Sequence, residues 1–213
     1  MPQPESDTLI TVLLVDDHLL VRRGFRRMLE DDPAIRVVGE AGDGPEAVDL
    51  ALARRPRVVV MDFALPSLNG ALATRRIAAA APEIAVLILS MHPEPAYVRN
   101  CFDAGARGYL LKNAMDLELV DAVKAVAAGR RVLDPRLAPP GDSPEAVPSL
   151  SARELEVLQL IVNGKSNKDI AAMLSLSANT VAVHRANIMQ ALDIHNTAEL
   201  VVYAIRHGLV SIA

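Results

Sequence analysis

Short apolar runs alternate with amphipathic stretches over the first 132 residues, and this alternation limits the possible folds more than any other feature of the chain. Runs rich in Val, Leu and Ile predict buried strands, and the amphipathic stretches predict helices. Strands and helices in alternation indicate a parallel sheet with helices on both faces. The expected strands are 9–15, 35–38, 58–61, 85–89 and 109–111, and the expected helices are 19–30, 45–54, 71–81, 94–104 and 117–128.

A proline-rich stretch at residues 133–148 interrupts this pattern. Because proline has no backbone N–H group and restricts the residue before it, the stretch predicts an extended, semi-stiff linker. We therefore expect one domain over residues 1–132 and a second over residues 149–213. The linker contains five of the 14 prolines of the chain, namely Pro135, Pro139, Pro140, Pro144 and Pro148.

Only helical patterns follow the linker. Four helices are expected, each opened by a polar capping residue. Two short helices joined by a tight turn at residues 175–177 are typical of a helix-turn-helix, whose second helix can enter the major groove of DNA. The expected helices are 152–162, 167–174, 178–192 and 197–207, and their caps are Ser151, Ser166, Ser177 and Asn196.

Composition excludes several classes of protein. The chain has 22 Lys and Arg residues against 26 Asp and Glu residues, which excludes a polybasic nucleic-acid coat. The single cysteine excludes an intramolecular disulfide and a cysteine-based zinc cluster. Aromatic residues make up 3% of the chain and Trp is absent, which argues against a stacking platform for single strands. No apolar run reaches the roughly 18 residues of a membrane helix, so we expect a soluble, cytoplasmic protein without membrane contact.

Polar side chains follow four of the five expected strands. Asp16 and Asp17 follow the first strand, Asp62 the third, Ser90 the fourth and Lys112 the fifth. The carboxyl ends of parallel strands share one edge of the sheet, where ligands of such folds bind. Converging carboxylates repel one another, and a hard cation with oxygen ligands, such as Mg²⁺, relieves that cost. The pattern predicts a site that can carry a phosphoryl group on a carboxylate.

This arrangement resembles the receiver domain of two-component response regulators over the first 130 residues. The resemblance implies a flavodoxin-like, five-stranded parallel sheet in the order 2-1-3-4-5. The motifs that carry it are Val15-Asp16-Asp17-His18, Glu40–Gly44 with Glu46-Ala47, Met61-Asp62 with Pro66, Ser90, and Gly108-Tyr109-Leu110-Leu111-Lys112.

The resemblance also implies residue roles. It makes Asp62 the phosphoacceptor, with Lys112 and Ser90 holding the phosphoryl oxygens. It makes Asp16, Asp17 and Asp62 the Mg²⁺ site, and Ser90 and Tyr109 the switch residues. The implied phosphoryl donor is a phosphohistidine on a sensor histidine kinase. Such a protein assists its own phosphoryl transfer but has no separate substrate, so it is not expected to be an enzyme.

Residues 149–210 resemble the LuxR-type helix-turn-helix, which joined to a receiver makes a NarL/FixJ-class regulator. The motifs are Leu150–Leu158, Gly164–Ala171, Ser177–His184, Ile188-Met189 and Leu192. The resemblance implies double-stranded promoter DNA as a partner and a homodimer after activation. The candidate DNA-binding residues are Lys165, Lys168, Asn179, Thr180, Ala182, Val183, His184, Arg185 and Ala186.

The second domain departs from that pattern where the family often has lysine. Ala182 and Ala191 occupy two such positions, and Ala186 is another small residue expected to face outward. Each lost contact with a DNA phosphate weakens DNA binding and makes the affinity depend less steeply on salt concentration. We therefore hypothesise DNA binding that is weaker, or more dependent on dimerisation, than is usual for the family. The alternative is a receiver-driven adaptor that contacts other proteins and binds DNA weakly or not at all.

Three further interpretations stay open at this point. An aspartate-nucleophile phosphatase could use the same carboxylates, but Ala64 stands where a second acid is expected. A basic face of the first helix is either solvated or a docking surface. The apolar stripe of the last helix is core, a dimer contact or both. The basic face consists of Arg22, Arg23, Arg26 and Arg27, and the stripe of Leu200, Val201, Ala204 and Ile205.

Overall fold

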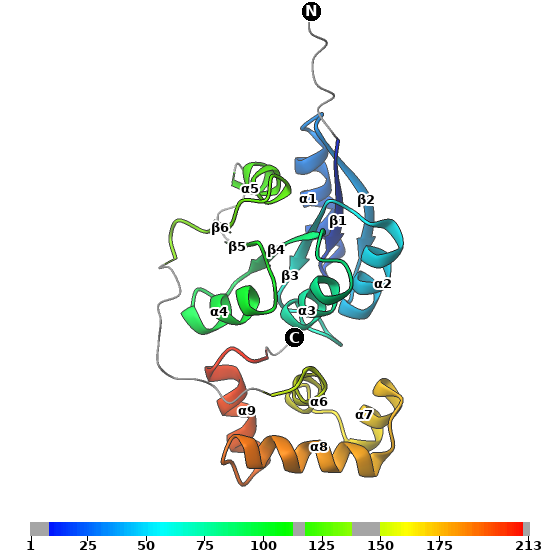
Figure 1. The fold of residues 1–213 in the computed structure, drawn as a ribbon, viewed down its shortest axis with the longest axis vertical. Coiled ribbons are helices and arrows are strands. Elements are labelled where there is room, and N and C mark those ends of the chain that lie inside the picture. Colours follow the sequence, from blue (N-terminus) through cyan, green and yellow to red (C-terminus); the bar gives the residue numbers. More distant parts are fainter. Residues whose placement is uncertain (1–8, 113–117, 138–149, 211–213) are drawn as a thin grey trace, which may run out of the picture.

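The structure is a computed structural model that describes residues 9–112, 118–137 and 150–210. It contains an α/β domain followed by a helical domain (Figure 1). The rest of the predicted linker, 138–148, lies outside the described residues.

A six-stranded parallel sheet forms the centre of the α/β domain, in the order β2-β1-β3-β4-β5-β6. The order 2-1-3-4-5 is confirmed, and a short sixth strand is added that the sequence did not predict. The strands are β1 (Ile10–Val15), β2 (Ile35–Ala41), β3 (Val58–Asp62), β4 (Ala85–Ser90), β5 (Gly108–Leu111) and β6 (Val132–Leu133).

Helices cover both faces of the sheet. Successive side chains of a strand point to opposite faces, so Val58 packs toward α1 and α5, whereas Val59 packs toward α2, α3 and α4. The central strands are buried on both sides, which explains their continuous apolar runs. The helices are α1 (Leu19–Glu30), α2 (Gly44–Arg54), α3 (Gly70–Ala80), α4 (Pro95–Asp103) and α5 (Glu118–Ala127).

The sixth strand joins the first residues of the predicted linker to the sheet. Asp134 is 0% exposed, and its carboxylate accepts a hydrogen bond from the Leu111 N–H at 2.9 Å and from the Arg136 guanidinium. The Asp134 N–H donates to the Tyr109 carbonyl at 2.9 Å. The segment from Leu133 to Leu137 therefore packs on the α/β domain, although the proline count predicted that the linker begins there.

Replacing Asp134 with asparagine is expected to destabilise the protein by about 1–2 kcal/mol at neutral pH. Burial disfavours the charged form, but the hydrogen bonds from Arg136 and Leu111 outweigh it and lower the pKa of Asp134 to about 2. Because the folded-state pKa is depressed, this stabilisation is present above about pH 4 and is lost as the pH falls toward 2. Urea unfolding at pH 7 and pH 3 measures it.

The matched control is Asp49→Asn, which changes an exposed aspartate of α2. It should unfold like the wild type at both pH values. A cost for Asp134→Asn that stays the same at pH 3 would show that the charge of Asp134 is not the source of the stabilisation.

Within residues 150–210 the helical domain consists of four capped helices, as predicted. Ser151 with Glu154 and Ser166 with Asp169 make capping boxes, in which each side chain bonds the other residue's backbone N–H group. Between α7 and α8 the chain turns through Ser175, whose φ is +54°. The helices are α6 (Ala152–Val162), α7 (Asn167–Leu174), α8 (Ala178–Ala191) and α9 (Thr197–Arg206).

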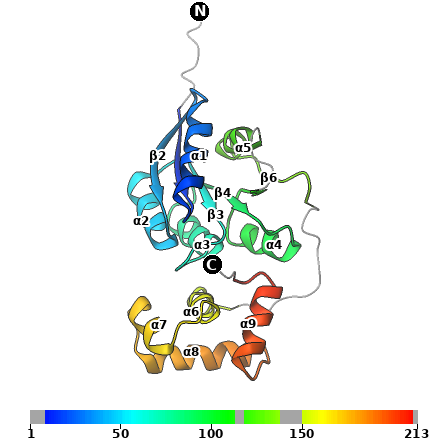
Figure 2. The same ribbon diagram turned by 180° about the vertical axis from the view of Figure 1, so that it is seen from behind.

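The two domains are in contact through α6, which lies between the α/β domain and α8 (Figures 1 and 2). Asn69 before α3 donates to the Gln159 side chain of α6 at 2.8 Å, and both residues are 0% exposed. The Arg76 Nε atom donates to Glu156 at 3.0 Å. Buried side-chain amides need hydrogen-bond partners, and here each of the two amides supplies the partner of the other. These contacts therefore hold the two domains in one docked arrangement.

Candidate functional site

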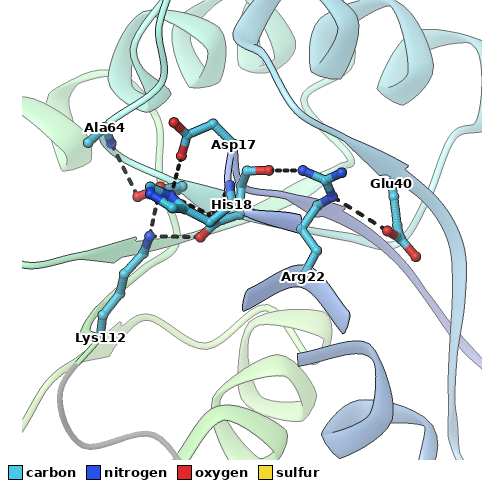
Figure 3. Close-up of polar contacts among 8 residues, drawn as sticks. Asp17, His18, Arg22, Glu40, Ala64 and Lys112 are labelled. Atoms are coloured by element: carbon cyan, nitrogen blue, oxygen red, sulfur yellow. Dashed lines mark hydrogen bonds and ion pairs between the residues drawn. The ribbon is translucent and has the colours of Figure 1, made fainter. Parts of the chain in front are cut away.

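Three charged side chains from separate strand ends converge at the carboxyl edge of the sheet. The Lys112 Nζ atom lies 2.7 Å from Asp16 Oδ2 and 2.7 Å from Asp62 Oδ2 (Figure 3). Asp16 and Asp62 are each 2% exposed. The pairing order places β1 beside β3, so the two acids are neighbours although 46 residues separate them along the chain. Lys112 therefore bridges two buried carboxylates.

Asp62 is held in an environment that disfavours its charge. Burial raises the pKa of Asp62 to about 6, since the opposing attraction of Lys112 is incomplete and the negative charge of Asp16 adds to the effect. The Ala64 N–H donates to Asp62 Oδ1 at 3.2 Å. Burial also opposes the charge of Lys112, but the two carboxylates outweigh it and the pKa of Lys112 is raised. The lysine therefore stays charged beside the acids.

Asp17 and His18 form the outer part of the acidic site. The His18 Nδ1 atom lies 2.7 Å from Asp17 Oδ1, and the Asp17 side chain is 30% exposed. Ligand atoms of Asp16, Asp17 and His18 all lie within 4.8 Å of one another. The carboxylates supply the oxygen donors that Mg²⁺ prefers, and two of them are buried with a single lysine between them. The donors of this acidic cluster therefore fit a divalent cation.

Ser90 and Tyr109 lie beside this site on β4 and β5. Ser90 is 1% exposed, and its Oγ atom accepts the His92 N–H at 3.1 Å. Tyr109 is 0% exposed, and its hydroxyl donates to the His92 carbonyl at 2.6 Å. Both residues therefore contact the loop that follows β4.

An aromatic cluster leads from this loop to the helical domain. The His92 and Tyr97 rings are stacked with centroids 4.3 Å apart, and Phe63, next to Asp62, meets both rings edge-on. The Tyr97 hydroxyl donates to the Ile205 carbonyl of α9 at 3.0 Å, and Asn100 donates to the Gly208 carbonyl at 2.7 Å. Sequence reasoning missed Tyr97, because no motif marks it and its partner lies 108 residues away.

Comparisons with known proteins agree with this geometry. The family model "Response regulator receiver domain" matches residues 12–124, which is more than half of the chain. The model "Bacterial regulatory proteins, luxR family" matches residues 148–204. The chain is a two-component response regulator with a LuxR-type DNA-binding domain. Membership in this family also places the regulator outside the classical enzymes.

Relatives match the regulator over nearly its whole length. The response regulator UvrY of Escherichia coli strain K12 is 39% identical over 209 residues, covering 94% of this chain and 96% of UvrY. The transcriptional regulatory protein LiaR of Bacillus subtilis is 37% identical, covering 95% of this chain and 100% of LiaR. The solved RcsB–DNA complex is 25% identical with a TM-score of 0.65, covering 91% of this chain and 97% of RcsB.

The candidate DNA-binding residues fall into two groups. Most are exposed, whereas Thr180, His184 and Arg185 are half-buried. Arg185 was expected to face outward, but its guanidinium donates to Asn167 at 3.3 Å and to Thr197 at 2.9 Å. The exposed residues are Lys165, Lys168, Asn179, Ala182, Val183 and Ala186.

The structure also describes the basic face of the first helix and the apolar stripe of the last helix. In the basic face of α1, Arg22 and Arg26 pair with Glu40, and all members except Arg22 are exposed. In α9, Leu200 is fully buried, so the apolar stripe contributes to the core. Among the described helices, none combines the length and apolar character that a membrane crossing requires.

Proposed function

We propose that this regulator accepts a phosphoryl group on Asp62 and that phosphorylation controls its binding to promoter DNA as a homodimer. The observation that carries the proposal is the position of the Lys112 amino group, 2.7 Å from both Asp16 and Asp62. A cation in this position neutralises a phosphoryl group placed on the neighbouring carboxylate. The arrangement joins three strand ends that are distant in sequence.

The chemistry assigned to the site is a transfer between two side chains. An Asp62 oxygen forms a bond to phosphorus while the nitrogen–phosphorus bond of a kinase phosphohistidine breaks, and the imidazole regains a proton. Lys112 and Ser90 then bind phosphoryl oxygens. Mg²⁺, when held by Asp16, Asp17 and Asp62, supplies further neutralisation of the transferred charge.

The switch assigned to the site uses Ser90 and Tyr109. In the unphosphorylated structure, the Ser90 hydroxyl accepts a hydrogen bond from the His92 N–H. A phosphoryl group on Asp62 attracts this hydroxyl toward the acceptor site. Movement of Ser90 changes the loop that also binds the Tyr109 hydroxyl. Because His92 and Tyr97 are stacked, that change reaches the contact with α9 and shifts a two-state equilibrium of the domains.

The domain division extends this proposal to the whole chain. Residues 1–132 act as the receiver, 133–148 as the linker and 149–213 as the DNA-binding domain, with the segment up to Leu137 anchored on the receiver. The proposed partners are a sensor histidine kinase, double-stranded promoter DNA and a second copy of the chain. No interaction with a membrane is proposed. A protein that binds promoters must reach chromosomal DNA, so the proposed location is the cytoplasm.

A mobility shift with genomic promoter fragments tests the proposal. We expect binding that strengthens when acetyl phosphate and Mg²⁺ are added. Phosphorylation without any mobility shift would instead favour the adaptor, in which α8 does not bind DNA and the output is a protein–protein contact.

DNA binding should depend on salt less steeply than is usual for the family. Ala182, Ala186 and Ala191 are uncharged and exposed on α8, and Arg185 is hydrogen-bonded within the domain. Fewer phosphate contacts release fewer counterions, so the slope of log K against log salt should be shallower than about −8. A titration of operator DNA at several salt concentrations measures the slope. A slope as steep as about −8 would contradict weakened phosphate contact.

A further inference from the structure

One face of α8 is solvent-exposed and carries no charged side chain. Its members recur at the three- and four-residue spacing that places side chains on one side of a helix. Val183 lies near the middle of this face and is 51% exposed. We call it the α8 face, and it consists of Asn179, Ala182, Val183, Ala186, Asn187 and Gln190, all exposed.

The opposite side of α8 is committed to the domain. Val181 and Ile188 are 0% exposed, and the half-buried Arg185 is hydrogen-bonded to Asn167 and Thr197. Arg185, the one arginine among the candidate DNA-binding residues, therefore uses its guanidinium in hydrogen bonds within the domain. Nearby positive charge comes from Lys165 and Lys168, which are exposed beside and within the first turn of α7.

The receiver does not cover the α8 face. In both views α6 separates α8 from the α/β domain, and α8 forms the far side of the molecule (Figures 1 and 2). On the helical domain, the described interdomain hydrogen bonds involve α6 with its C-cap Asn163, and the end of α9 with its following turn. The docked arrangement therefore leaves this face open to a partner.

The chemistry of the α8 face matches one pair of bases. In the major groove, Asn and Gln form bidentate hydrogen bonds with adenine, and small apolar groups pack against the thymine methyl group. Guanine is read mainly by Arg or Lys, and the cytosine amino group by Asp or Glu. None of the six residues of the α8 face belongs to these charged types.

We propose that α8 selects A·T base pairs at the centre of each DNA half-site, with Val183, Ala182 and Ala186 on thymine methyl groups and Asn179 on adenine. The proposal rests on the proposed function, in which α8 enters the major groove. It goes further by assigning base preference to side chains that make no phosphate contact. Affinity then comes from the flanking lysines and from dimerisation, and specificity from methyl and amide contacts.

The first experiment is selection of bound sequences from a random duplex library with the full-length protein, acetyl phosphate and Mg²⁺. We expect half-sites whose central positions are A·T pairs. Replacing one of these pairs with G·C should weaken binding by about 10-fold to 100-fold. Selection of central G·C pairs would overturn the base preference but leave the proposed function intact. Failure to bind any duplex would contradict the proposed function itself.

The second experiment replaces thymine with deoxyuridine, which removes only the methyl group. At each contacted position binding should weaken by about 4-fold, the effect of one buried carbon group. Val183→Ala should reduce that discrimination, because it shortens the side chain assigned to the methyl contact. An exposed residue is replaced, so the fold is retained.

Val202→Ala is the matched control, since Val202 is a 55% exposed valine on α9. The ratio of thymine to deoxyuridine affinity should stay at the wild-type value even if dimerisation changes. Equal affinity of the wild-type protein for the two duplexes at every central position would overturn the methyl contacts.

Discussion

Asp62→Asn is expected to abolish phosphorylation of the regulator by acetyl phosphate. The amide has nearly the shape of the carboxylate and can still accept the Ala64 N–H, but its neutral oxygen is a poor nucleophile. Incubation with acetyl phosphate and Mg²⁺, followed by mass spectrometry of the intact protein, measures the result. The wild type should gain one phosphoryl group and the variant none.

The control for this experiment is Asp49→Asn, which removes an exposed carboxylate of α2 and should be phosphorylated like the wild type. Peptide mapping then locates the phosphoryl group in the wild-type protein. Continued phosphorylation of Asp62→Asn would place the acceptor on another residue and would contradict the proposed role of Asp62.

Lys112→Met is expected to slow phosphorylation by about 10-fold to 100-fold, because a hydrogen bond to a charged group contributes about 1.5–3 kcal/mol. Methionine keeps most of the side-chain volume and removes the charge. In the wild type the ammonium group lies 2.7 Å from both Asp16 and Asp62. Without it, the phosphoryl group formed on Asp62 loses its nearest protein cation. The measurement is the initial rate of phosphorylation by acetyl phosphate at saturating Mg²⁺.

Lys124→Met is the matched control, since Lys124 pairs with Asp32 at 2.6 Å but lies on α5, outside the phosphoacceptor site. It reports the general effect of losing a paired lysine, which is small for an exposed ion pair. Its phosphorylation rate should equal that of the wild type. An equal loss of rate in the two lysine variants would show that Lys112 acts only through stability.

Much of the site could be predicted because its residues stand at strand ends. A parallel sheet brings all carboxyl ends of its strands to one edge, so the sequence alone predicts that Asp16, Asp62 and Lys112 lie together. The exposure of each member was not predictable. Asp16 and Asp62 are almost fully buried, while Asp17 remains partly exposed beside His18. The burial of each side chain depends on the helices and loops that cover the carboxyl edge of the sheet. A local sequence pattern does not predict that covering.

The partners of Arg185 were likewise not predictable from the sequence. Its position on α8 predicted an outward, basic side chain. Helical spacing gives the side of the helix on which a residue lies, but not which neighbouring helices its side chain reaches. Asn167 and Thr197, its partners, belong to α7 and α9. Only packing of the three helices brings those acceptors within reach, and it leaves a neutral face for DNA.

Local order along the chain was sufficient for the alternation of strands and helices, the helix caps, the acidic motif and the helix-turn-helix, since each depends on neighbouring residues. Packing over long separations decided the remaining features. It added β6 through the buried Asp134, paired Asn69 with Gln159, and linked Tyr97 to α9. These contacts join residues 23, 90 and 108 positions apart, and such distances carry no periodic signal in an amino-acid sequence.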